Sequence, residues 1–221
     1  MQRFLRDNGL SLVLLTVFIA TLIGQSITGF TVYNNDQRDH QQGEVTFNTY
    51  LTSGHYMESV FENWESEFLQ DAAYVILTVY LFQRGSSESK DPDKEEPVDA
   101  DPRDSQDDPE APWPVRRGGI WLQLYEYSLF LTFIILFFLA FALHAVGGAA
   151  EYNHEQLLHG GDTISTSQYI TTSQFWFESF QNWQSEFLAL FSIVTLSIVL
   201  RQRGSPESKP VASPHSRTGE A

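Results

Sequence analysis

The chain has 221 residues, a formal net charge of −15 and no cysteine. The lack of cysteine excludes disulfides, thiolate metal sites and cysteine nucleophiles, and the excess of acidic residues argues against a nucleic-acid-binding protein, which needs a basic surface. The mean hydropathy of −0.22 is that of a soluble protein. This average, however, combines strongly apolar segments with an acidic spacer and polar loops.

The first apolar segment follows a short stretch that contains Arg3 and Arg6. Residues 9–33 carry no charge and are mostly apolar, and about 20 such residues form a helix that crosses the hydrocarbon core of a bilayer. A cleaved signal peptide has the same order of basic and apolar residues. This segment is longer than a signal core and has no obvious small-x-small cleavage site, so we predict a retained transmembrane helix.

The second apolar segment, residues 60–82, is polar in its first third and apolar in its last third. We predict that it is a second transmembrane helix and that the polar residues 34–58 between the two segments lie outside the bilayer. Tyr33, Gln37 and His40 follow one another at i, i+4 and i+7, which places them on one helical face. This spacing predicts that the first helix continues beyond the membrane.

Residues 91–118 form an acidic spacer that is rich in proline and poor in large apolar residues in most of its length. Such a segment buries too little apolar surface to offset the entropy that it loses on ordering. We therefore predict that the spacer is disordered. The chain ends in a short polar tail, residues 210–221.

The two halves of the chain repeat each other. Residues 61–90 and 180–209 align at a constant offset of 119, with 17 of 30 positions identical, which indicates a tandem duplication. The second half contains two further apolar segments, residues 120–146 and 180–200. The sequence thus predicts an all-α polytopic membrane protein of four transmembrane helices, arranged as two duplicated helical hairpins in repeats 1–90 and 119–209.

The orientation follows from the basic residues. Twelve lysine and arginine residues lie on the side of the two termini and the spacer, whereas Arg38 stands alone on the other side. Lysine and arginine near the ends of membrane helices concentrate in the cytoplasm. We therefore predict a cell-membrane protein whose direct partner is the lipid bilayer and whose termini and spacer are cytoplasmic.

Several short motifs are similar to those of a known family. They are LTSGH at residues 51–55, NWESEFL at 63–69, QRGS at 83–86 and ESK at 88–90, together with Arg3, Phe4 and Arg6, NGLS at 8–11 and the Tyr33-Asn34 pair. In these motifs the chain resembles an uncharacterised family of small prokaryotic membrane proteins, classed as a domain of unknown function. The resemblance implies an integral membrane protein and supplies no catalytic residue.

The candidate functional residues are polar side chains within the apolar segments. Gln25, Glu67, His144 and Glu186 lie at matched depth in the four predicted helices, and Asp71 lies one turn deeper. A charged group within a membrane is costly, so these side chains are expected to face the bundle interior, a partner or water. Such a layer is either a clamp between helices or a path for protons or ions.

Two asparagine-tryptophan pairs lie where predicted helices meet the outer headgroups. Asn63 and Trp64 belong to the first half, and Asn182 and Trp183 are their counterparts. Tryptophan at this depth is typical of an anchor in the membrane interface.

The sequence indicates no metal site, cofactor or catalytic residue. His40 and His159 are potential metal ligands, but straight helices would hold His40 roughly 20 Å from Glu67, too far for the histidines and the glutamates to share an ion. The sequence has no glycine-rich phosphate loop and no HExxH motif.

We therefore expect a non-enzymatic structural or accessory membrane protein that self-associates or binds a membrane-protein partner. The alternative is a small proton- or ion-coupled channel or transporter that uses Glu67, Asp71, His144 and Glu186. A membrane enzyme ranks third.

Overall fold

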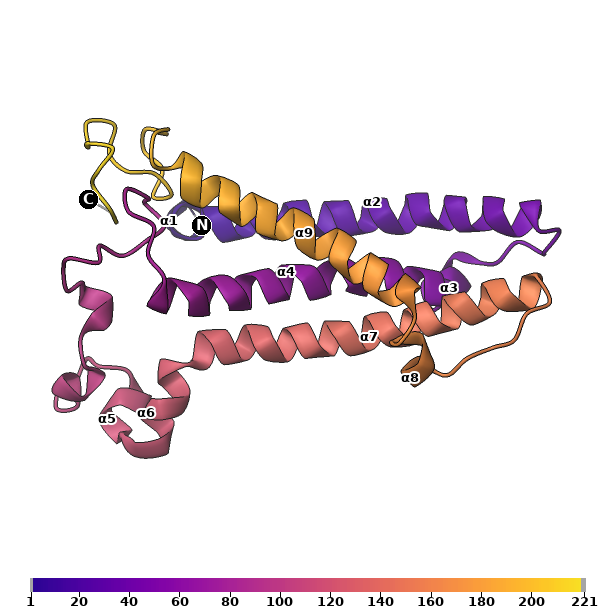
Figure 1. Cartoon of the computed structure of the whole chain (residues 1–221), viewed down its shortest axis with the longest axis horizontal. Helices are drawn as coiled ribbons and strands as arrows, with labels where there is room; N and C mark the ends of the chain where they lie inside the picture. Colours follow the sequence, from indigo (N-terminus) through magenta and orange to yellow (C-terminus); the bar gives the residue numbers. More distant parts are fainter. Residues whose placement is uncertain (1, 220–221) are drawn as a thin grey trace. The chain divides into compact units, whose positions relative to one another are not determined.

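The structure is a computed structural model that describes residues 2–219. Met1 and residues 220–221, at the ends of the predicted first repeat and tail, lie outside the described residues. Residues 2–219 contain helices and turns and no strand, which confirms the all-α fold class. In chain order the elements are α1 (Gln2–Asp7), α2 (Gly9–Asp39), α3 (Phe47–Tyr50), α4 (Gly54–Tyr80), η1 (Pro97–Asp99), η2 (Pro102–Ser105), α5 (Trp113–Arg117), α6 (Gly119–Glu126), α7 (Ser128–Leu158), α8 (Thr166–Tyr169) and α9 (Ser173–Leu196) (Figure 1).

Two of these helices are long and apolar enough to cross a membrane. They are α2 and α7, each of 31 residues. The buried core helix of a soluble protein has a similar composition, but only 6% of the apolar stretch of α2 and 22% of that of α7 is buried. Two of the four predicted transmembrane helices therefore have the required length and composition in the described residues. Spans at α4 and α9 stay a prediction.

The helix ends differ from the predicted spans in two ways. The α2 helix continues to Asp39 and α7 to Leu158, so both helices extend well past the apolar segments, as the spacing of Tyr33, Gln37 and His40 predicts. The third apolar segment, predicted as one helix over residues 120–146, is instead interrupted at Tyr127. The Ser128 hydroxyl donates to the Tyr125 carbonyl oxygen at 2.8 Å, a local bond that competes with helix continuation.

The chain divides into two compact units. Unit 1 consists of Met1–Phe61 and Ala142–Phe175, and unit 2 of Glu62–Phe141 and Trp176–Ala221. Each unit takes one segment from each half of the sequence. The predicted boundaries of the two repeats stay a prediction.

In unit 1 the loops after α2 and α7 are held by equivalent asparagines. The Asn34 side chain accepts a hydrogen bond from the backbone N–H of Val45 at 2.8 Å and donates to its carbonyl at 3.3 Å. Asn153 makes the same two bonds to Ile164, at 2.7 and 2.9 Å. These positions are 119 residues apart, so the same local structure occurs at the same register in both halves.

Two tyrosines that follow these loops pack against glycines of the long helices. Tyr50 and Tyr169 are fully buried. A Cβ atom added at Gly29 would lie 2.1 Å from the Tyr50 hydroxyl, and one added at Gly148 would lie 2.6 Å from the Tyr169 hydroxyl. Each tyrosine ring therefore occupies the space that a side chain at the glycine would fill, and a larger residue there would have to displace the ring.

In unit 2 the repeated QRGS and ESK motifs form the same turn twice. Gly85 and Gly204 adopt positive φ angles of 88° and 84°, which glycine permits at little cost. The backbone N–H groups of Gln83 and Gln202 each donate at 2.9 Å to the serine hydroxyl six residues later. The second turn also places Lys209, which is almost fully buried, with its ammonium group donating to the carbonyls of Gly85, Pro214, His215 and Arg217.

The acidic spacer contains turns, the two short 3₁₀ helices η1 and η2 and the short helix α5, and ion pairs join some of its residues. Arg84 pairs with Asp93 at 2.8 Å and Arg103 with Asp101 at 2.7 Å. These side chains are largely exposed, and exposed ion pairs contribute little to stability. Disorder of residues 91–118 therefore stays a prediction.

Candidate functional site

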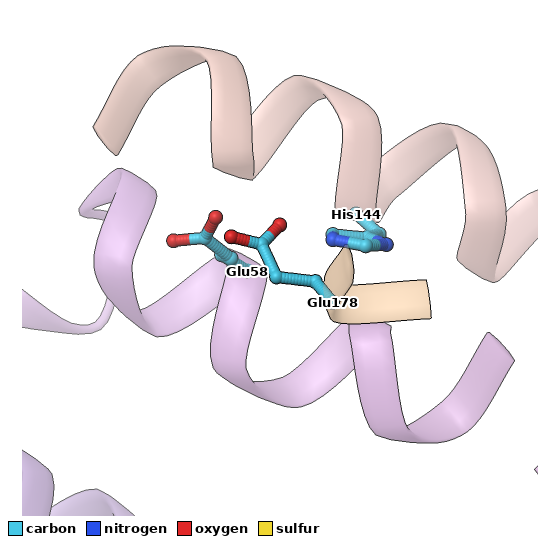
Figure 2. Close-up of side chains that lie close together, drawn as sticks. All are labelled: Glu58, His144 and Glu178. Atoms are coloured by element: carbon cyan, nitrogen blue, oxygen red, sulfur yellow. The ribbon is translucent and has the colours of Figure 1, made fainter. Parts of the chain in front are cut away.

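A histidine and a glutamate lie together in the interior of unit 1. His144 on α7 is fully buried, and its ring stacks on Phe175 of α9 with centroids 4.7 Å apart. Glu58 on α4 accepts a hydrogen bond of 3.0 Å from the Tyr169 hydroxyl. A ligand atom of Glu58 lies within 4.8 Å of one of His144, and Figure 2 shows both side chains between α4 and α7. Glu178, also labelled there, follows Phe175 by three residues on α9.

Small residues bring α4 and α7 close enough to place this pair. A Cβ atom added at Gly54 would lie 2.5 Å from the backbone nitrogen of Glu151, and one added at Gly147 would lie 2.7 Å from that of Glu58. Ala145 is also almost fully buried. Small residues let helix backbones approach closely, so the sequence of α7 around residue 147 determines where Glu58 and His144 lie.

A second polar cluster of unit 1 surrounds Tyr33. Its ring lies 5.6 Å from that of Tyr50, 5.4 Å from that of His55 and 6.3 Å from that of His154. Gln37 is 4% exposed, and its side-chain nitrogen lies 3.2 Å from Nε2 of His154. Within the described part of the chain, Oε1 of Gln37 and Nδ1 of His55 are buried without a hydrogen-bond partner. Buried polar atoms of this kind are the groups to which internal water binds.

Burial changes the acidity of groups in this cluster, which includes Glu151 because its carboxylate accepts a hydrogen bond from the His55 backbone. About 20 helical residues cross a bilayer core, so a span that begins at Ser128 ends near Gly147 and leaves Glu151 outside it. Burial, followed by repulsion from Glu155, raises the pKa of the Glu151 carboxyl to about 7. Burial also lowers the pKa of His55 and raises the pKa of Tyr50 to about 12. Near pH 7, His55 therefore favours its neutral form, whereas the Glu151 carboxyl is about half protonated.

The predicted polar layer is divided between the two units. Gln25 and His144 belong to unit 1, and Glu67, Asp71 and Glu186 to unit 2. The Gln25 side chain donates to the Ser59 carbonyl at 3.2 Å, a bond between α2 and α4. In unit 2, Glu67 lies close enough to Glu186 and Asp71 for their charges to interact. A single layer of all five residues stays a prediction.

In unit 2 the buried carboxylate is Glu65 rather than Glu67. Glu65 is fully buried and accepts a 3.0 Å hydrogen bond from the Trp183 indole N–H, whereas Glu67 is exposed. Two residues along a helix correspond to a rotation of about 200°, so the two glutamates point to opposite faces. The indole N–H of Trp183, which is half-buried, thus has a carboxylate acceptor.

Two of the four predicted interface anchors, Trp183 and Asn182, donate hydrogen bonds to other residues of unit 2. Besides the bond of Trp183 to Glu65, the Asn182 side chain donates to the Glu178 carbonyl at 3.2 Å. Asn63 is exposed, and Trp64 is half-buried. An anchoring role in a membrane interface stays a prediction for all four residues.

Sequence reasoning did not identify Glu58, Tyr169, Glu65 or Glu151 as members of polar clusters. For Tyr169 the sequence did contain a usable pattern, because Tyr50 and Tyr169, like Gly29 and Gly148, are 119 residues apart. A glycine that recurs together with a tyrosine at the repeat offset indicates a close contact of the two residues.

Residues 1–220 match the family model described as Domain of unknown function (DUF6766). The chain belongs to this family. No curated protein and no solved structure matches it.

Membership of DUF6766 confirms the family resemblance that the LTSGH, NWESEFL and QRGS motifs indicate. The matched range includes the spacer as well as both apolar halves. Because the family carries no assigned activity, a functional proposal has to come from the residues of this chain.

Proposed function

We propose that this protein is a multi-pass membrane protein with a non-enzymatic, structural or accessory role. The observation that carries the proposal is the exposure of large apolar side chains along most of α2. They are Leu10, Val13, Leu14, Leu15, Val17, Phe18, Ile19, Ile23 and Ile27. A continuous apolar surface of this extent is not stable in water, and the length of α2 suits a bilayer.

The repeat at offset 119 supports four spans rather than two. Three local structures recur at this offset. They are the loop hydrogen bonds of Asn34 and Asn153, the contacts between a tyrosine and a glycine, and the QRGS turns. We therefore infer a tandem duplication in which α4 and α9 are equivalent helices that both cross the membrane. The twelve basic residues on one side then place both termini and the spacer in the cytoplasm.

The polar side chains support a structural role, because many of them join neighbouring helices. Within unit 1, Gln25 bonds to Ser59, and the Ser26 hydroxyl lies 2.9 Å from that of Tyr56. Within unit 2, Trp183 bonds to Glu65. Such bonds in membrane proteins contribute about 0.6 kcal/mol each on average, and together they hold the helices in a bundle. The outer surface of this bundle would contact lipid, a second copy of the chain or another membrane protein.

The topology predicts which single cysteines an impermeant thiol reagent reaches in intact cells. We expect Gln42→Cys and Asp162→Cys, in the loops after α2 and α7, to be labelled, because these loops lie outside the cytoplasm. Ser105→Cys in the spacer and Ser213→Cys in the tail should be labelled only after lysis. Since the chain has no native cysteine, each signal reports one site. Labelling of Ser105→Cys in intact cells would contradict the orientation.

The second candidate function is a proton or ion path, and two observations favour it. In unit 1, His144 of the predicted third span is fully buried next to Glu58, which lies just outside the predicted second span. In unit 2, Glu67 lies close enough to Glu186 and to Asp71 for their charges to interact. Carboxylates and histidines inside membrane helices form the proton relays of transporters.

Flux measurements on Glu67 variants distinguish the two functions. For a structural role, we expect purified protein in liposomes to give the same proton and cation flux as empty liposomes. Glu67→Gln should then change neither flux nor thermal stability, because its side chain is exposed in unit 2. A pH-dependent flux that Glu67→Gln abolishes while the fold survives would establish the path instead. Asp71→Leu is the matched control, because Leu190 occupies the equivalent position in the second half. A purely structural role should tolerate this substitution.

A further inference from the structure

Two histidines meet at the C-terminal ends of α2 and α7 in unit 1. His40 and His159 are equivalent residues at the repeat offset, and their ring centroids lie 5.5 Å apart with the planes at 80°. Both residues are exposed. The two histidines are 119 residues apart in the sequence, and the arrangement of the helices brings them next to each other.

The same hydrogen bond determines the tautomer of both rings. Nδ1 of His40 lies 3.0 Å from the Asp36 carbonyl oxygen, and Nδ1 of His159 lies 2.8 Å from that of Glu155. A carbonyl oxygen only accepts, so each Nδ1 carries the proton. In the neutral ring Nε2 is then the nitrogen with a lone pair. Metal-binding histidines commonly use this arrangement, in which one nitrogen donates to a carbonyl and the other binds the ion.

We propose that His40 and His159 together bind one divalent transition-metal ion, of which Zn²⁺ is the representative, through their Nε2 atoms. Zn–N bonds of about 2.0–2.1 Å in tetrahedral geometry place the centres of two imidazole rings about 5 Å apart. The separation of 5.5 Å is close to that value. Water completes the coordination, because both rings are open to solvent. Asp36 adds negative charge, its carboxylate lying 3.5 Å from Nδ1 of His40.

This site is independent of the proposed membrane function, since it uses residues beyond the apolar part of both helices. It also follows from the repeat: a duplicated helix with one histidine near its end produces a two-histidine site when the two copies lie side by side. One copy alone offers a single imidazole, which is too few ligands for a specific site.

Isothermal titration of the purified full chain with Zn²⁺ tests the proposal, using a tag that contains no histidine. We expect one ion per chain in the wild type. In the His40→Asn/His159→Asn double variant the affinity should fall at least 100-fold. Asparagine keeps a side-chain donor near the position of Nδ1, so the carbonyl bond is retained while the metal ligand is lost. Each single variant should lose at least tenfold.

The matched control is His215→Asn, which removes another exposed histidine and should leave Zn²⁺ affinity unchanged. Spectra of bound Cu²⁺ provide an independent measurement, because paramagnetic resonance resolves the two coordinating imidazole nitrogens in the wild type and not in the double variant. If the double variant binds Zn²⁺ as tightly as the wild type, or if the wild type does not bind it, the two rings only pack against each other and the proposal is wrong.

Discussion

Replacing Gly147 with alanine is expected to lower the free energy of unfolding by about 3 kcal/mol, the upper part of the usual range for an overpacked interior. The added Cβ atom would lie 2.7 Å from the backbone nitrogen of Glu58 and 2.8 Å from the Cβ atom of Met57. Neither neighbour is the end of a flexible side chain, so α4 and α7 have to separate. Unfolding of the detergent-solubilised protein, followed by circular dichroism, measures the loss.

Gly24→Ala is the matched control for this prediction. Gly24 is also a glycine within a long helix, α2, but no heavy atom lies within 4 Å of an added Cβ atom. Alanine is a better helix former than glycine by up to about 1 kcal/mol, so Gly24→Ala should leave stability unchanged or raise it slightly. Equal effects of the two substitutions would contradict the close crossing of α4 and α7.

Replacing Glu151 with glutamine is expected to stabilise the protein at pH 8 and to have little effect at pH 4. The pKa of the Glu151 carboxyl is about 7 in the folded protein and about 4.5 in the unfolded chain. As the pH rises from 4.5 to 7, the unfolded state releases this proton before the folded state does, so stability is lost over that interval. This difference in pKa corresponds to about 3 kcal/mol of stability lost at pH 8.

Glutamine keeps an oxygen for the hydrogen bond that Glu151 accepts from the His55 backbone and removes the titration. Denaturation at a series of pH values measures the effect, and Asp162→Asn, at an exposed position in the loop after α7, controls for the loss of one negative charge. His55 contributes with the opposite sign, because its lowered pKa makes stability fall as the pH drops below about 6.5. A flat difference between Glu151→Gln and wild type from pH 4 to 8 would show that the carboxyl is not desolvated.

The sequence by itself determined the family, the helical class and the length of the apolar segments. These properties depend on composition and on local spacing: a continuous uncharged segment is recognisable as a long apolar helix, and the i, i+4, i+7 spacing correctly extended that helix to Asp39. The repeat at an offset of 119 residues is also visible in the structure, because Asn34 and Asn153 hold their loops with the same hydrogen bonds. The interruption at Tyr127 was missed, since no proline or glycine marks it.

The tertiary structure alone decided which polar residues meet. The choice between Glu65 and Glu67 depends on the rotation of α4 about its axis and on an acceptor for the Trp183 indole N–H, and depth along a helix contains no information about rotation. The pairing of Glu58 with His144 depends on how closely α4 and α7 approach at Gly54 and Gly147. His40 and His159 are far apart in the sequence, and they meet because α2 and α7 extend side by side beyond their apolar parts.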